Sequence, residues 1–102
     1  MGTNKKTENE SLADVGIEIP KEYRVVMLND NFTTVDFVVQ VLQIIFKKTL
    51  QQSEKIAQEI HEKGASIVGV YPYSIAQEKI YETHSLAQKY GNPLKCKLER
   101  ED

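Results

Sequence analysis

The sequence predicts an α+β fold, a two-layer sandwich with the order β-α-α-β-α-β, in which a three-stranded antiparallel sheet carries three helices on one face. Two observations lead to this fold class. Three short segments rich in strand-forming residues alternate with segments whose apolar residues recur at helical spacing. The chain has only 102 residues, and three strands cannot cover three helices on both faces, so a single helical layer is expected.

The first strand is expected at residues 23–28, where YRVVML combines β-branched and aromatic residues. After a polar turn, Thr33 stands three residues before Asp36, which is the spacing of a capping box at a helix start. Apolar residues then recur at helical spacing as far as Lys48. Because Lys47 and Lys48 fall in the last turn, their charges suit the helix dipole.

The second half of the chain predicts two more helices and two more strands. One helix follows the cap residue Thr49 and ends at Gly64, which can adopt a left-handed conformation. Gly69 lies inside the following strand, so a bulge or a close backbone approach is expected there. The third helix ends at Gly91. The predicted ranges are 50–63 and 75–90 for the helices and 66–71 and 94–99 for the strands.

The formal net charge of −2 lies entirely at the start of the chain. Residues 1–22 hold three basic and five acidic residues, whereas residues 23–102 hold ten of each. With scattered aliphatic residues and no aromatic residue, the first segment is expected to be a flexible tail (1–22) that precedes one core domain (23–102). The acidic balance argues against nucleic acid as a partner, and no run approaches the ~20 apolar residues of a membrane span.

Few residues point to catalysis or to a cofactor. Cys96 is the single cysteine and falls within a predicted strand, which is typical of a small buried side chain. His84 is expected at an exposed helix position, and His61 near a helix end, where it can complement the dipole. Because metal-ligand, nucleotide-loop and catalytic-triad spacings are missing, we expect no enzyme, no metal and no cofactor. One cysteine also fits a reducing, cytoplasmic compartment.

Four motifs stand out when they are taken together. They are YRVVMLNDNFTTVDFVVQVL (23–42), Ile60-His61 with Gly64, GVY (69–71) and NPLKC (92–96). This combination resembles ClpS, the bacterial adaptor family that hands N-degron substrates to a Clp AAA+ unfoldase. The resemblance covers about residues 23–99. It implies a small sandwich with a flexible amino-terminal extension, which binds substrates in the bacterial cytoplasm and does no catalysis.

The resemblance implies a binding site for the first residue of a substrate. The contacts to its free α-amino group fall on Asn29, Asp30 and His61. These residue types suit that task, because a protonated amine has three donors and a positive charge, and needs acceptors and an opposite charge. A first side chain of the Leu, Phe, Tyr or Trp type would enter a pocket lined by Asn31, Thr33, Val35, Val38, Ala57, Ile60 and Leu94.

Two of these pocket positions depart from the family pattern. Val35 and Ala57 stand where many relatives carry methionine. The shorter side chains are expected to admit Ile or Val first residues better than typical relatives do.

The resemblance also implies a partner, a ClpA-like unfoldase bound through its amino-terminal domain. Ser74, Gln77 and Lys79 fall on the unfoldase-facing surface. Because Ser74 and Gln77 replace frequent glutamates, this surface is expected to be less acidic than in relatives. The tail at 1–22 is expected to be engaged by the unfoldase during delivery.

Two other functions fit the same element order or residues. The carboxyl-terminal domain of the ribosomal stalk shares the order and recruits factors, but it leaves Asn29, Asp30 and His61 unexplained. A small enzyme could use Asp30 and His61 as an acid–base pair, but it lacks a nucleophile, metal or cofactor motif to complete the site.

Overall fold

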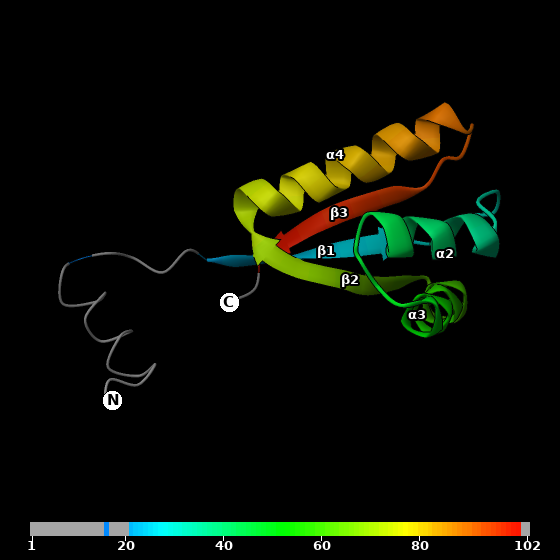
Figure 1. Cartoon of the computed structure of the whole chain (residues 1–102), viewed down its shortest axis with the longest axis horizontal. Coiled ribbons are helices and arrows are strands. Elements are labelled where there is room, and N and C mark those ends of the chain that lie inside the picture. Colours follow the sequence, from blue (N-terminus) through cyan, green and yellow to red (C-terminus); the bar gives the residue numbers. More distant parts are fainter. Residues whose placement is uncertain (1–15, 17–20, 101–102) are drawn as a thin grey trace.

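The computed structural model describes residue 16 and residues 21–100, so nearly all of the predicted tail lies outside the described residues. The predicted α+β class and element order are confirmed (Figure 1). The first strand begins one residue earlier than expected, at Glu22. The elements are β1 (Glu22–Leu28), α2 (Val35–Ile44), α3 (Leu50–Lys63), β2 (Ala65–Pro72), α4 (Tyr73–Lys89) and β3 (Lys95–Arg100).

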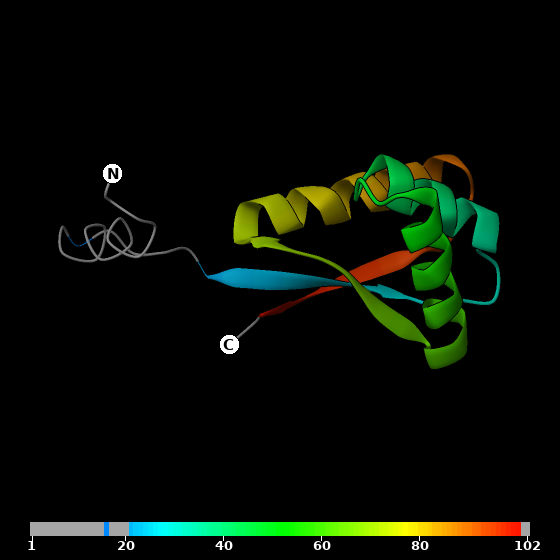
Figure 2. The same cartoon turned by 60° about the horizontal axis from the view of Figure 1, so that its bottom comes forward.

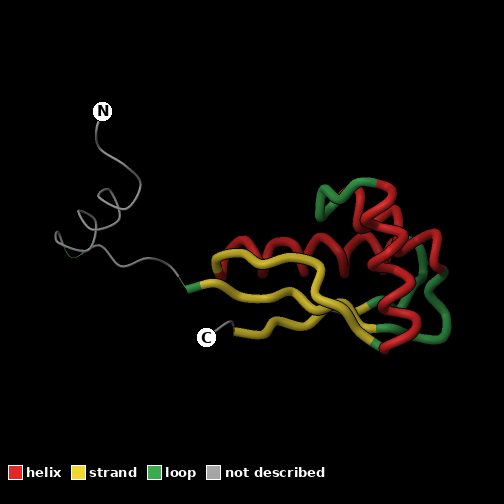
Figure 3. The backbone as a smooth tube through the Cα atoms, turned by 90° about the horizontal axis from the view of Figure 1, so that it is seen from below, coloured by secondary structure: helices red, strands yellow, loops and turns green. Residues whose placement is uncertain are grey.

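The three strands form one antiparallel sheet in the order β2-β1-β3, with β1 in the centre. Figure 2 shows α2 and α4 above the same face of this sheet. The remaining helix, α3, runs steeply across one end of the sheet rather than flat upon that face, and Figure 3 shows it crossing the ends of the strands. The loop that follows β1 leads into α2 and is hydrogen-bonded through Asn29 to Gly64 at the end of α3, and the candidate site forms at this junction.

The hydrophobic core lies between the sheet and the helices. Met27 of β1, Leu42 of α2 and Val68 of β2 are almost completely buried there. Ala76 and Ala87 of α4 are equally inaccessible, because small side chains let that helix approach the strands closely. This packing holds the central part of each helix and strand in place, and so it also positions the ends of these elements.

The first helix, α2, is shorter at both ends than the sequence predicted. Its cap is Thr34, whose side chain accepts a hydrogen bond from the Phe37 N–H at 3.1 Å, so the predicted Thr33–Asp36 capping box is wrong. Thr33 is not free to cap, because its hydroxyl donates to Asp30. The helix ends at Ile44, and Lys47 adopts a positive φ of 56°, so the predicted lysine-rich last turn is also wrong.

A lysine from another element provides charge at the end of α2. The Lys79 ammonium on α4 donates to the Ile45 carbonyl at 2.9 Å. A cation at the carboxyl end of a helix opposes the negative end of its dipole. This contact also joins α4 to α2, which are 34 residues apart in the chain at this point.

The second helix, α3, matches its prediction at both ends. Thr49 and Gln52 exchange two hydrogen bonds between side chain and backbone, at 3.0 and 3.1 Å, and so form a capping box. Gly64 ends the helix with a φ of 89°, and its N–H donates to the Ile60 carbonyl. Leu50, the first residue of this helix, is half exposed.

The irregularity predicted around Gly69 is present in β2. The pairing register with β1 shifts between Val25 and Val26, which leaves Val68 as an extra residue in a bulge. The Tyr71 ring lies against Gly69, at the position that a β-carbon would occupy. A β-carbon at this position would force the outer end of the Tyr71 ring to move, so the close approach of this side chain favours glycine.

His84 lies partly buried between α4 and β3, so the predicted exposed position is wrong. Its Nε2 atom accepts a hydrogen bond from the Cys96 backbone N–H at 3.0 Å. Burial and the nearby Lys95 lower the pKa of His84, although the bond from Cys96 acts in the opposite direction. Both histidine and cysteine are therefore structural here, since they help to hold α4 against β3.

We predict that the Cys96 thiol is unreactive in the folded protein. Burial raises its pKa to about 12, although a hydrogen bond with Thr83 lowers it in part, so almost no thiolate forms at pH 8. Reaction with an aromatic disulfide reagent should be at least ~100-fold slower in native buffer than in guanidinium chloride. Equal rates in the two solutions would contradict this burial.

Candidate functional site

The loop between β1 and α2 is organised by one carboxylate. Oδ1 of Asp30 accepts hydrogen bonds from the backbone N–H groups of Phe32 and Thr33, at 2.8 and 2.7 Å. Its other oxygen, Oδ2, accepts from the Thr33 hydroxyl at 2.6 Å. An aspartate that bonds the backbone two and three residues later folds a tight turn. These three hydrogen bonds therefore restrain the loop from Asp30 to Thr33.

The same contacts keep Asp30 ionised. Burial tends to raise the pKa of this carboxyl, but the hydrogen bonds from Thr33 and Phe32 outweigh burial and hold the pKa below its ordinary value. A carboxylate has about four lone-pair positions, and three hydrogen bonds leave one free for a further donor. Asp30 can thus shape the loop and still offer a negative charge to a ligand.

A backbone hydrogen bond brings this loop to the end of α3. The Asn29 N–H donates to the Gly64 carbonyl at 2.9 Å. His61 lies one turn before Gly64, in the last turn of α3, and is exposed. Two segments far apart in the sequence therefore place an amide, a carboxylate and an imidazole around one opening.

These residues surround a hollow of about 410 Å³. This volume lies within the range of about 300–1,000 Å³ that is typical of small-molecule pockets. Buried Val38, Ala57 and Ile60 make its walls apolar, while Asn29, Asp30 and His61 are polar. The hollow thus combines acceptors and a negative charge with an apolar interior.

Nine of the ten residues predicted for the site line this hollow together. Leu94 does not: it is buried and lines a neighbouring hollow with Phe32 and His84. Two lining residues, Phe32 and Thr34, were not predicted, although their position among the polar residues of the segment 29–34 was a usable signal. The nine are Asn29, Asp30, Asn31, Thr33, Val35, Val38, Ala57, Ile60 and His61.

The residues predicted for the partner surface lie elsewhere, in the first turns of α4. Ser74 and Gln77 are exposed, and the Gln77 amide donates to the Tyr73 hydroxyl at 2.8 Å. Lys79 is partly buried by its bond to the Ile45 carbonyl. Lys79 therefore has a structural role whatever else it contacts.

The arrangement can bind a cationic donor that is attached to an apolar group. In the described part of the chain, no cluster of three or more His, Cys, Asp or Glu side chains could hold a metal ion. None of the described helices has the length and apolar character needed to cross a bilayer. The fold and the site define a small ligand-binding domain of the α+β class.

Comparison with known proteins identifies the family. The family model described as "ATP-dependent Clp protease adaptor protein ClpS" matches residues 18–97. The chain therefore belongs to the ClpS family, the non-catalytic adaptors of the ATP-dependent Clp protease. This membership decides against both the ribosomal-stalk and the enzyme alternatives.

The relatives cover nearly the whole chain. The Clp protease adapter ClpS of Nautilia profundicola is 43% identical over 97% of this chain and 98% of its own length. That of Lawsonia intracellularis is 43% identical over 91% of this chain and 85% of its own. The solved structure of Agrobacterium tumefaciens ClpS2, bound to L-phenylalaninamide, has a TM-score of 0.79 and 32% identity, and covers 81% of this chain and 100% of that one.

The Asp30 carboxylate is expected to stabilise the fold in a pH-dependent way. Because its pKa is lowered on folding, its stabilisation is complete above the ordinary value of 3.8 and is lost as the pH falls through the folded pKa. Asp30→Asn keeps the shape but removes the charge. The wild type should therefore have a higher Tm than this variant at pH 7, and the difference should shrink as the pH falls below about 4. A difference that stays constant down to pH 2 would contradict this role.

Proposed function

We propose that this chain binds the free amino group and the first side chain of N-degron proteins and delivers them to a ClpA-like AAA+ unfoldase. The proposal rests on one observation: His61 and the charged Asp30 line the same hollow, whose walls are apolar. L-phenylalaninamide, which the A. tumefaciens relative binds, has the two matching parts, a free amine and an apolar side chain.

The amine would be held by three acceptors. Asp30 offers its remaining lone pair and its charge, Asn29 offers its side-chain carbonyl, and His61 accepts through a ring nitrogen in its neutral form. A charge-assisted hydrogen bond is worth roughly 1.5–3 kcal/mol net. Acetylation would remove the charge and leave the acceptors unpaired, so discrimination against acetylated amines follows directly.

The first side chain would enter between α2 and α3. Burial of a Leu, Phe, Tyr or Trp side chain against Val38, Ala57 and Ile60 contributes roughly 1.5–3 kcal/mol. The hydrogen bonds and the buried side chain together, less the ordering costs of association, are consistent with a binding free energy near −8 kcal/mol, which corresponds to a Kd of about 1 μM. Val35 lines this hollow and is half exposed, and its side chain is shorter than the methionine expected at this position in relatives, which leaves more room for branched side chains.

Delivery would use a second surface and the amino-terminal tail. Ser74 and Gln77 are exposed on α4 and provide neutral polar groups for the amino-terminal domain of the unfoldase. The tail at 1–22 would be the segment that the unfoldase grips, in the bacterial cytoplasm. Because Lys79 also holds the end of α2, its substitution would affect stability as well as this surface.

Peptide binding should depend on a free amine and on the first residue. In fluorescence anisotropy, carboxyl-terminally labelled peptides that begin with Phe or Leu should bind at micromolar Kd, whereas acetylated Phe and free Ala peptides should bind at least ~30-fold more weakly. Asp30→Asn should weaken binding of the Phe peptide by a similar factor, because the charge is lost while the loop shape is retained. Binding that ignores acetylation would contradict the proposal.

The same assay tests the breadth of the pocket. If the short side chains of Val35 and Ala57 widen it, an Ile peptide should bind within about tenfold of the Leu peptide. The substitutions Val35→Met and Ala57→Met should then weaken binding of the Ile peptide but leave binding of the Leu peptide unchanged. Rejection of Ile by the wild-type protein would sink this part of the proposal alone.

Removal of residues 1–17 should separate binding from delivery. This truncation leaves the described elements intact, so the Kd for a Phe peptide should be unchanged. Degradation of a Phe-starting reporter by the unfoldase and its protease should be lost. Delivery at the full rate by the truncated protein would mean that the tail has no part in it.

A further inference from the structure

A second, larger hollow adjoins the candidate site. It has a volume of about 610 Å³ and lies along the groove between α2 and α3. Val35 and His61 line both hollows, so the second one begins at the rim where the amine would bind. From there it extends along the helices past Val39 and Glu54 to Leu50. A peptide that leaves the first hollow at this rim enters the groove directly.

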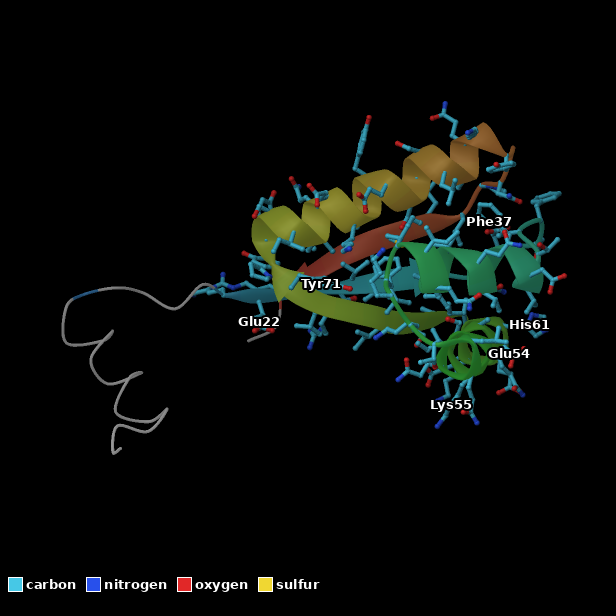
Figure 4. All side chains as sticks on the ribbon, in the orientation of Figure 1. Glu22, Phe37, Glu54, Lys55, His61 and Tyr71 are labelled. Carbon is cyan, nitrogen blue, oxygen red and sulfur yellow. The ribbon has the colours of Figure 1, made fainter. Side chains whose placement is uncertain are left out.

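The charges in this groove have one sign. Asp36 on α2 and Glu54 on α3 are both exposed and line it, and its other described lining residues include no lysine or arginine. Figure 4 shows Glu54 on the same side of α3 as His61, whereas Lys55 points away from them. Val39 and Leu50 add apolar surface, which suits the aliphatic stem of a long basic side chain.

Helix and strand geometry determine which peptide residue would reach these carboxylates. Glu54 precedes His61 by seven residues, which is about 10 Å along the axis of α3. In an extended peptide, successive side chains point to opposite sides, so the third residue faces the same surface as the first. It lies about 7 Å further along the chain, and a lysine or arginine side chain spans the remaining distance to Glu54.

The hollow on the other side of the site has the opposite character. It shares only Phe32 with the first hollow, and Lys95 lines it. A peptide that ran in that direction would favour an acidic residue. A preference for a basic residue would therefore indicate that the peptide leaves the site along the groove between α2 and α3, and a preference for an acidic residue that it leaves past Lys95.

We propose that the groove between α2 and α3 is a subsite for a basic side chain at the third position of the substrate, with Glu54 and Asp36 as its charge partners. This inference rests on the proposed function and adds a specificity that the first-residue pocket alone does not have. It assigns a preferred substrate class, in which an apolar first residue is followed two positions later by lysine or arginine.

Labelled peptides with one varied position test this subsite. Peptides beginning Phe-Ala-Lys, Phe-Ala-Glu, Phe-Lys-Ala and Phe-Ala-Ala, with a common neutral remainder, are titrated with protein at low salt. Phe-Ala-Lys should bind about three to fivefold more tightly than Phe-Ala-Glu, because exposed charge pairs make modest contributions. Relative to Phe-Ala-Ala, the affinity of Phe-Lys-Ala should increase less than that of Phe-Ala-Lys. The differences in affinity between the peptides should become smaller at high salt.

Variants of Glu54 show whether this residue is responsible. Glu54→Gln should reduce the preference for Lys over Glu, and Glu54→Lys should reverse it, while Phe-Ala-Ala binds within about twofold of the wild type in both. Glu82→Gln makes the same charge change at an exposed position on α4 and should leave the preference unaltered.

Several results would overturn the subsite while leaving the first-residue pocket in place. These are equal binding of all Phe peptides, a preference for Glu, an equal gain from Lys at the second position, or a Lys preference that survives both Glu54 variants. Failure of Phe-Ala-Ala to bind at all would overturn the proposed function, and the subsite with it.

Discussion

The candidate site depends on the hydrogen bond from the Asn29 N–H to the Gly64 carbonyl. This bond joins the end of the central strand to the end of α3, two points that are 35 residues apart in the chain. Gly64 makes it possible, because its left-handed conformation ends the helix and turns the chain into β2. The bond extends the pairing of Leu28 with Ala65 by one residue, and so brings the loop that carries Asp30 beside the helix turn that carries His61.

Asp30 then gives the loop its shape and its charge with a single side chain. Hydrogen bonds from Phe32 and Thr33 restrain the carboxylate and favour its ionised form, so the negative charge is present before any ligand arrives. Such preorganisation lowers the entropy lost on binding. It also means that truncation of Asp30 to alanine would disturb loop and charge together, which is why an isosteric asparagine separates the two effects.

Local signals in the sequence predicted the elements, and contacts over long distances account for what they missed. The ends of α3 were predictable because Thr49 and Gly64 act within their own turns. The start of α2 was not, because two adjacent threonines compete for one cap and Asp30 occupies the first of them. The bond of His84 to β3 and that of Lys79 to α2 join elements that the sequence does not show to be neighbours. The family motifs predicted ten residues for one site, and nine of them line one hollow, while Leu94 is buried and lines a neighbouring hollow.

The most direct test of the account is a titration of ¹⁵N-labelled protein with L-phenylalaninamide and, as a control, its N-acetylated form, followed by amide chemical shifts. The account predicts that the free amine shifts the amides of Asn29 to Thr33 and of the turn around His61, with smaller changes along α2 near Val38. The acetylated compound should leave these amides almost unmoved. Equal shifts with both compounds, or shifts confined to α4 and the open face of the sheet, would contradict the claim that this junction is the amine-binding site.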